Sequence, residues 1–261
     1  MHDMVICTHS EDQNLAGKGV MREGEMSTRL GLTPWCGLAE SIVVARDILL
    51  AGFTGSRLHI GHISSWQSIE MVRWGKAHGV KVTCEATPHH IALTDEKCAA
   101  FDSNFKMNPP LGTAEDRQAV IEGLLDGTID VIATDHAPHT EEEKKVEFSL
   151  APNGVIGLET ALGVVAKELI VTKKLTWSDL VQKMSIAPRK ILHLPVPAIK
   201  TGEVAELTLI DPEAVWRVDP EKFLSKGRNS AFIGQNLSAK SIGILNRGWV
   251  LISPEARILW T

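Results

Sequence analysis

Four short runs of β-branched or apolar residues alternate with longer segments of helical periodicity, and this alternation constrains the fold more than any other feature of the sequence. The predicted strands cover residues 4–7, 57–63, 80–86 and 129–134, and the helices between them cover residues 39–50, 65–78 and about 113–125. Alternating strands and helices favour a parallel sheet with right-handed crossover connections. The first run, Met4-Val5-Ile6-Cys7, predicts a buried strand.

The number of strand–helix units does not match the length of the chain. A chain of 261 residues is long enough for one complete (β/α)8 barrel, but such a barrel needs eight units and only four are present. A long helix over about 156–170 and shorter helices around 175–184 and 188–192 follow the fourth strand. Beyond Pro195, short strands at 204–210, 239–245 and 249–252 indicate a β-rich appendage. We therefore predict half of a barrel over residues 1–195, with four βα units, and a small β-rich composite domain over residues 196–261.

The composition excludes several classes of protein. A net charge of −5 gives no reason to expect a nucleic-acid partner, and no apolar run approaches the roughly 18 residues that cross a membrane. The first residues lack the basic and apolar regions of a signal peptide. The four cysteines form no CxxC pair, which favours reduced thiols. These features predict a soluble cytoplasmic α/β protein.

Histidine or aspartate follows each of the four predicted strands. The segments are Thr8-His9-Ser10-Glu11-Asp12, His59-Ile60-Gly61-His62, Thr87-Pro88-His89-His90 and Thr134-Asp135-His136-Ala137-Pro138-His139. Active sites of parallel α/β folds are built at the carboxyl ends of the strands. Imidazole and carboxylate together suit zinc or a similar divalent metal. The sequence therefore predicts a metal site at this edge of the sheet.

The position of each residue predicts a different role. His9 directly follows a strand, and His62 lies nearer than His59 to the carboxyl end of the second strand. We therefore expect His9 and His62 to be metal ligands and His59 to be structural. His89 and His90 fit ligation and support of other ligands equally well. Asp135 follows a very apolar strand and needs a strong partner such as a cation, so we expect it to be both a metal ligand and a general base. His139 is placed to contact substrate.

The charged run Glu141-Glu142-Glu143-Lys144-Lys145, on the same loop, is interpreted as solvated.

Together these segments resemble the dihydroorotase family of the amidohydrolase superfamily. The resemblance covers essentially the whole chain in family order, and although each motif alone is weak, the set is specific. Its motifs are His-Ser-Glu-Asp at 9–12, His-Ile-Gly-His-Ile-Ser at 59–64, Thr-Pro-His-His at 87–90, Asn-Pro-Pro-Leu at 108–111, Thr-Asp-His-Ala-Pro-His at 134–139, Ala-Pro-Asn-Gly-Val-Ile-Gly-Leu-Glu-Thr at 151–160 and, more weakly, Leu-Ser-Lys with Arg-Asn at 224–229.

The resemblance implies a metal-dependent TIM-type barrel, of which this chain holds the second half. It also implies reversible cyclisation of N-carbamoyl-L-aspartate to L-dihydroorotate, a step of pyrimidine synthesis. His9 and His62 match ligands of the second metal, and Asp135 matches a ligand of the first metal and the catalytic base. The matching substrate-binding positions are Asn108, His139, Asn153 and Gly154.

The departures from the family pattern concern the metal site. The family's His-x-His pair and its bridging carboxylate or carbamylated lysine have no counterpart here, and Gly112 stands where an arginine usually follows Asn-Pro-Pro-Leu. The resemblance implies two zinc ions in a complete enzyme. For this chain alone we expect one weakly bound ion or none, and little or no turnover.

Two alternatives to this reading stay open. Within the enzyme class, hydantoinases, dihydropyrimidinases and allantoinases share the metal frame, but Asn108 and His139 favour a substrate with an acidic side group. In a different class, the chain would be a non-catalytic scaffold or partner protein. The expected partners are a small-molecule substrate and either further copies of the chain or aspartate transcarbamoylase.

Overall fold

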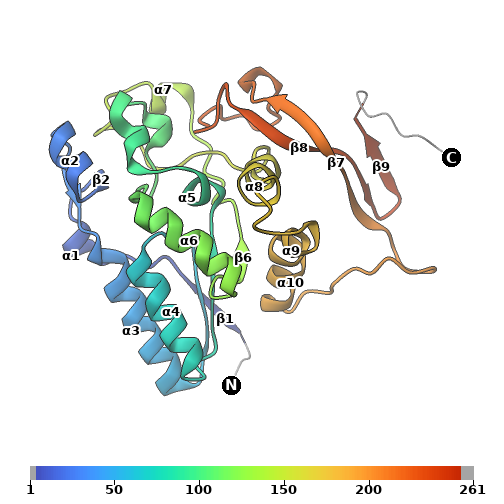
Figure 1. Ribbon diagram of the computed structural model, residues 1–261, viewed down its shortest axis with the longest axis horizontal. Helices are drawn as coiled ribbons and strands as arrows, with labels where there is room; N and C mark the ends of the chain where they lie inside the picture. The colour runs from blue at the N-terminus through green and yellow to red at the C-terminus, as the bar shows by residue number, and fades with distance from the viewer. Residues whose placement is uncertain (1–3, 254–261) are drawn as a thin grey trace.

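The computed structural model describes residues 4–253 of the chain and contains a four-stranded parallel sheet (Figure 1). Its strands lie in the order β1-β4-β5-β6, in which each strand pairs with the next in parallel register. The sheet consists of β1 (Val5–Thr8), β4 (Arg57–Ile60), β5 (Val82–Ala86) and β6 (Val131–Ile132). The parallel pairing and the strand order confirm the predicted βα alternation, although β6 is shorter than predicted.

The helices that connect these strands form where their periodicity predicts them, and they carry the expected end signals. The three helices are α3 (Leu38–Thr54), α4 (Trp66–Ala77) and α6 (Ala114–Asp126). Ser65 accepts a hydrogen bond from Ser68 N at the start of α4, and Thr113 forms a capping box at the start of α6. Gly127, in the left-handed conformation, ends α6.

One apolar core joins these helices to the sheet. Side chains from α3, α4 and α6 pack against β4, β5 and β6, and the deepest of them include Ile48, Ile69, Ile121, Ile60 and Cys84. Figure 1 shows α3, α4 and α6 side by side over the strands. This core packs the three helices against β4, β5 and β6. The carboxyl ends of these strands are therefore held together at one edge of the sheet.

Strand β1 differs from its prediction. Its side chain at Ile6 is 53% exposed and Cys7 is also exposed, so the expectation of a buried strand is wrong. Within residues 4–253, β1 pairs only with β4. An apolar strand is buried only if something covers both of its faces, and the described chain does not supply that cover for β1.

Several short elements decorate the connections between the main strands and helices. They are α1 (Gln13–Ala16), β2 (Met21–Arg22), α2 (Glu25–Leu30), β3 (Pro34–Trp35), α5 (Pro88–Ala92), η1 (Asp95–Ala100), η2 (Ser103–Phe105) and α7 (Glu141–Lys144). The two-residue strands β2 and β3 pair in parallel. None of these short elements was predicted, because segments of two to six residues carry too little periodicity.

A run of helical segments follows the last parallel strand. It consists of α8 (Ala161–Val165), η3 (Ala166–Ile170), α9 (Trp177–Val181), η4 (Gln182–Ile186) and α10 (Ala187–Ile191). The predicted start near Ile156 is five residues too early. Ile156 N donates to Asn229 O and Gly157 N donates to His136 Nδ1, so these residues are held in a loop instead of a helix.

An antiparallel sheet forms the last part of the described chain. Its strands β7 (Glu206–Arg217), β8 (Asn236–Asn246) and β9 (Trp249–Ile252) lie in that order, and η5 (Pro220–Lys222) sits between the first two. Helix α8 packs against β8, and in Figure 1 helices α8–α10 lie between the two sheets. Strands form in all three predicted places, but β7 runs to Arg217, seven residues beyond its predicted end. The domain boundary at Pro195 stays a prediction. None of the helices in residues 4–253 is long and apolar enough to span a membrane.

Candidate functional site

The ends of β1 and β4 bring two of the predicted ligands together. His9 follows β1 and His62 lies two residues beyond the end of β4, and Gly61 N donates to Thr8 O at 2.9 Å to hold the two loops together. The Nδ1 atom of His9 lies 2.9 Å from Nε2 of His62. His62 adopts a φ of 34°, in the left-handed region that is unfavourable for a side-chain-bearing residue. The local backbone is therefore held in a costly conformation at the point where the imidazoles meet.

Two further side chains complete this histidine cluster, which we define as His9, Glu11, His62 and Asn108. Glu11 Oε2 lies 3.2 Å from His9 Nε2 and accepts a hydrogen bond of 2.5 Å from Asn108 Nδ2. The structure thus places the predicted substrate-binding Asn108 beside the two predicted metal ligands. The sequence places Glu11 in the motif at residues 9–12 and assigns it no role of its own. Its position two residues after His9, on a loop leaving a strand, was the available signal.

The histidine cluster holds polar atoms that the described residues leave without a hydrogen bond. These are His62 Nδ1 and Asn108 Oδ1, and His89 Nε2, on the helix that follows β5, is in the same condition. Buried polar atoms are almost always paired in a complete structure. Paired imidazoles and unmatched acceptors fit a site that receives a divalent metal and a polar ligand, as predicted for His9 and His62.

The donor set is nevertheless incomplete for a metal centre. Within residues 4–253 there is no group of three or more His, Cys, Asp or Glu side chains placed to hold a metal ion. A zinc site with an open catalytic position has three protein ligands. The described residues therefore offer two imidazoles that fit a metal, and they do not offer the full set.

Asp135 lies on the loop that follows β6. It has a φ of 47°, and its side chain is exposed. The strand β6 ends at Ile132, three residues earlier, and the chain has already turned out of the core. No hydrogen bond or ion pair in residues 4–253 holds its carboxylate. Its role as ligand and base stays a prediction.

The loops after β6 and before α8 form a second group, the amide cluster, defined as His139, Asn153, Gly154 and Asn229. His139 Nε2 donates to Asn153 O at 2.9 Å. Gly154 has a φ of 121°, and a Cβ there would come within 2.6 Å of Ala137 Cβ, so only glycine fits. Three of the four predicted substrate-binding residues therefore lie together here.

Asn229 joins the two loops of the amide cluster. Its Oδ1 accepts from His139 N at 3.1 Å, and its Nδ2 donates to Ala137 O at 2.9 Å and to Gly154 O at 3.1 Å. The side chain is buried. The sequence places Asn229 in the weakest of the resembling motifs and assigns it no role, because its partners are 75 and more residues away in the chain.

The histidines next to β4 and β5 are buried. His59 is held between Thr83 Oγ1 and Glu85, which agrees with its predicted structural role. His90 contacts Thr87 Oγ1 and Pro109 O, and burial lowers its pKa to about 4. Burial also lowers the pKa of His89 well below its usual value. Neutral imidazoles can support or bind a metal, so both interpretations of His89 stay open.

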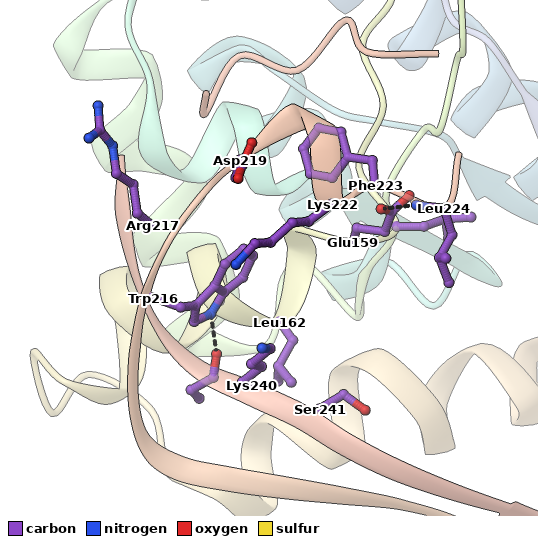
Figure 2. Close-up of a pocket in the computed structure, with 13 residues that line it drawn as sticks. Glu159, Leu162, Trp216, Arg217, Asp219, Lys222, Phe223, Leu224, Lys240 and Ser241 are labelled. Atoms are coloured by element: carbon purple, nitrogen blue, oxygen red, sulfur yellow. Dashed lines mark hydrogen bonds between the residues drawn. The ribbon is translucent and has the colours of Figure 1, made fainter. Parts of the chain in front are cut away.

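A well-formed cavity lies away from both clusters. It has a volume of about 430 Å³ and lies between α8 and strands β7 and β8. Figure 2 shows Trp216, whose indole donates to Ala239 O, together with Leu162 and Phe223 on its walls and charged groups of both signs around them. None of the predicted site residues lines this cavity. Its charged residues are of both signs and do not form a recognisable catalytic or metal-binding set.

The interpretation of residues 141–145 as a solvated run is wrong at one position. Glu141 and Lys145 pair with each other at the surface, but Lys144 is only 6% exposed. Its ammonium is directed into the loop that carries the amide cluster. Sequence alone could not distinguish it from Lys145, because both are lysines in the same charged stretch.

The fold and the polar strand ends together match one family. Residues 41–250 match the amidohydrolase family, and residues 1–68 match a dihydro-orotase-like family. Because the first match covers most of the chain, the chain belongs to the amidohydrolase family. Proteins of this superfamily are generally metal-dependent enzymes that act on small molecules.

Individual relatives narrow the comparison. The chain is 53% identical over 237 residues to a dihydroorotase of Pelotomaculum thermopropionicum. The aligned region covers 91% of this chain and 56% of that protein. The chain is 48% identical over 253 residues to a dihydroorotase of Syntrophus aciditrophicus, with 97% and 59% covered. The chain therefore spans less than two thirds of the length of these curated relatives.

Solved structures show the same fold at lower identity. An L-hydantoinase (dihydropyrimidinase) from Arthrobacter aurescens superimposes with a TM-score of 0.85 at 24% identity, covering 98% of this chain and 58% of that one. A D-hydantoinase from a Thermus species gives a TM-score of 0.84 at 20% identity, with 97% and 58% covered. At these identities the likeness concerns the fold alone.

Proposed function

We propose that this chain contributes the carboxyl-terminal part of a dihydroorotase, which interconverts L-dihydroorotate and N-carbamoyl-L-aspartate in pyrimidine biosynthesis. The observation that carries the proposal is the contact of His9 with His62 beside Asn108, at the ends of neighbouring parallel strands. The identities of 53% and 48% to two dihydroorotases support the choice among the amidohydrolases.

In this proposal the parallel sheet is the second half of a (β/α)8 barrel, and residues 196–261 belong to a composite β domain. The exposed apolar side chains on β1 and on α3 support this, because Ile6, Leu49 and Phe53 would be covered by neighbouring barrel units. The share of 56–59% that the chain covers of its relatives is also what half a barrel with an appendage requires.

Zinc is the metal we propose, with two ions in a complete enzyme and one or none in this chain alone. His9 and His62 would supply two nitrogen ligands and Asp135 an oxygen ligand. A divalent metal, when bound, lowers the pKa of water and polarises a carbonyl oxygen. Since no described group offers three ligands, binding to this chain alone is expected to be weak.

The chain's own residues divide the remaining tasks. The exposed carboxylate of Asp135 is free to take a proton from water and to return it to the ring nitrogen of the substrate as the amide bond breaks. Asn108, His139, Asn153 and Gly154 would bind the polar groups of the substrate. Because Nε2 of His139 is fixed as a donor to Asn153 O, its ring orientation is set before substrate arrives.

An assay on a completed enzyme tests this proposal. The amino-terminal part of the Pelotomaculum thermopropionicum relative would be joined to this chain, and ring opening would be measured with dihydroorotate, hydantoin, dihydrouracil and allantoin. We expect turnover of dihydroorotate only. Preference for hydantoin, dihydrouracil or allantoin would move the chain to the corresponding cyclic amidohydrolase.

One observation favours the second candidate, a non-catalytic scaffold. The described residues do not form a three-ligand metal group, and a scaffold does not need one. Zinc titration of the completed enzyme and of its His9→Ala variant separates the two, because only the enzyme predicts zinc bound by His9 and His62. We also propose a cytoplasmic location and, as partners beyond the substrate, further copies of the chain or aspartate transcarbamoylase.

A further inference from the structure

Two lysines are buried beneath the loop that precedes α8. Lys144 is 6% exposed and Lys106 is 5% exposed. Nζ of Lys144 donates to Pro152 O and Gly154 O, both at 3.0 Å, and lies 3.5 Å from Lys106 O. Its ammonium therefore contacts three carbonyl oxygens from two separate segments of the chain.

Lys106 holds the first part of the same loop. Its Nζ donates to Ser149 O at 3.0 Å and to Ala151 O at 2.7 Å. The two ammonium groups together bind four carbonyl oxygens within residues 149–154. Taking a cation out of water costs free energy unless hydrogen bonds replace the lost hydration. In this case the carbonyl oxygens of one loop provide that replacement.

The loop also connects directly to the segment that carries Asn108. Gly154 N donates to Lys106 O at 3.0 Å, the same carbonyl oxygen that Lys144 approaches. Lys106 lies two residues before Asn108, and Gly154 follows Asn153. The ammonium of Lys144 thus lies where two segments meet. Residues 106–108 include Asn108 of the histidine cluster, and residues 152–154 include Asn153 and Gly154 of the amide cluster.

The charges around Lys144 come from three elements. Burial is the largest cause that lowers its pKa, to about 8, and the nearby Lys106 lowers it further, while Asp102 acts in the opposite direction. On its own helix α7, Glu141 pairs with Lys145 and Glu143 approaches His139. Glu142 is exposed, and of the acidic groups only Asp102 raises the pKa of Lys144. Carbonyl dipoles are therefore the main partners of this cation.

We propose that Lys144 is a positioning residue for the substrate pocket, whose ammonium fixes the 152–154 loop against residues 106–108. It thereby sets the separation between Asn108 on one side and Asn153 and Gly154 on the other. The identity of the substrate rests on the function proposed above. The ordering of the loop by Lys144 does not, because it depends only on contacts within this chain.

Amide hydrogen exchange of the 261-residue chain tests this role without any ligand. Lys144→Met keeps the length of the side chain but removes the donors, and Lys145→Met is the matched control at the neighbouring exposed position. We expect amides in residues 149–157 to exchange about 10-fold faster or more in K144M, because hydrogen bonds from a charged group are lost. K145M should exchange like the unaltered chain.

Lys144→Arg provides the rescue, because it retains a cation with several donors and should restore part of the protection. Should K144M fail to fold, Lys144→Gln replaces it in the same comparison. Exchange in residues 149–157 that stays within about twofold would overturn the proposal, as would faster exchange spread evenly over the chain. A completed enzyme that does not act on dihydroorotate would disprove the proposed function and leave this exchange result standing.

Discussion

The two edges of the parallel sheet, which we call the β1 side and the β5 and β6 side, differ in how completely the chain covers them. On the β1 side, Ile6 is 53% exposed and the outward residues of α3, Leu49 and Phe53, are exposed too. On the β5 and β6 side, Ala86 and Ile132 are buried and the loops beyond them are joined by buried polar groups such as Asn229. The apolar side chains are thus covered on the β5 and β6 side of the sheet and exposed on the β1 side.

This difference separates the two halves of the proposed site. The amide cluster, at the covered side, is held in place by Asn229 and by the two buried lysines. The histidine cluster, at the open side, has an exposed His9 and retains polar atoms on His62 and Asn108 without partners among the described residues. The chain organises the amide cluster, with three of the four proposed substrate-binding residues, by itself, whereas we propose that the metal site depends on further protein.

The largest expected effect concerns Asp135, which lies on the covered side but points to solvent. In the completed enzyme, Asp135→Asn should lower kcat for dihydroorotate by about 10³-fold, because an amide cannot carry the transferred proton. Steady-state kinetics measure the loss, with Glu142→Gln, at an exposed position on α7, as the control. A loss of less than tenfold would remove Asp135 from the proposed chemistry.

A matched pair of isoleucines tests the difference in cover directly. Ile60 on β4 is 0% exposed and Ile6 on the neighbouring β1 is 53% exposed. Ile60→Ala should lower the free energy of unfolding by about 2–5 kcal/mol through the lost contacts and the cavity. Ile6→Ala should change it by less than about 0.5 kcal/mol.

Urea denaturation of the 261-residue chain measures both isoleucine variants. The completed enzyme sharpens the comparison, since Ile6→Ala should cost more there, by about 1 kcal/mol or above, once β1 is covered. Equal small effects of Ile6→Ala in both chains would contradict the half-barrel.

Zinc binding tests the open side. Any zinc binding of the 261-residue chain should weaken in His9→Ala by about 100-fold or more, because removing a proposed ligand costs more than the 10- to 100-fold lost with a group that only supports a ligand. Competition with a chromophoric chelator measures the affinity. His78, exposed at the end of α4 and stacked on Trp74, provides the control variant His78→Ala. Binding of two ions by the unaltered chain would show that its donor set is complete after all.

The buried histidines of α5, which follows β5, predict that acid lowers the free energy of unfolding. This is the smallest of the expected effects. Burial lowers the pKa of His90 from 6.5 to about 4. Between these values the unfolded chain binds a proton that the folded chain does not, so stability is present above pH 6.5 and falls toward pH 4. The loss should be on the order of 2 kcal/mol.

Unfolding experiments at several pH values in the presence of EDTA measure this loss. His90→Gln should flatten the dependence between pH 6.5 and 4, and His78→Gln should leave it as in the unaltered chain. A slope that is unchanged in His90→Gln would place the acid sensitivity elsewhere.

Much of the fold and part of the site follow from local patterns. Helices α4 and α6 begin and end within about one residue of their prediction, because Ser65, Thr113 and Gly127 carry cap signals that act within a few residues. The pairing of His9 with His62 also follows from the sequence, since neighbouring parallel strands end at the same edge of the sheet. These features depend on contacts that are close in the chain or on a simple topology.

The remaining features depend on contacts between distant segments. Exposure of Ile6 depends on what packs over β1, and burial of Lys144 depends on a loop eight to ten residues away that turns back over it. Glu11 and Asn229 join the clusters through partners 97 and 75 to 90 residues away. A pattern of residue types has no information about such distances.

The sequence by itself determined that the chain forms parallel βα units and that imidazole and carboxylate groups occur at the strand ends, because periodicity and chain direction act locally. Only the tertiary structure decided which of these groups meet and which side of the sheet is covered. It placed His9 beside His62, left Asp135 in solvent, and buried one of two adjacent lysines. The physical reason is that burial and hydrogen bonding depend on the whole packed chain, whereas propensity depends on a few neighbouring residues.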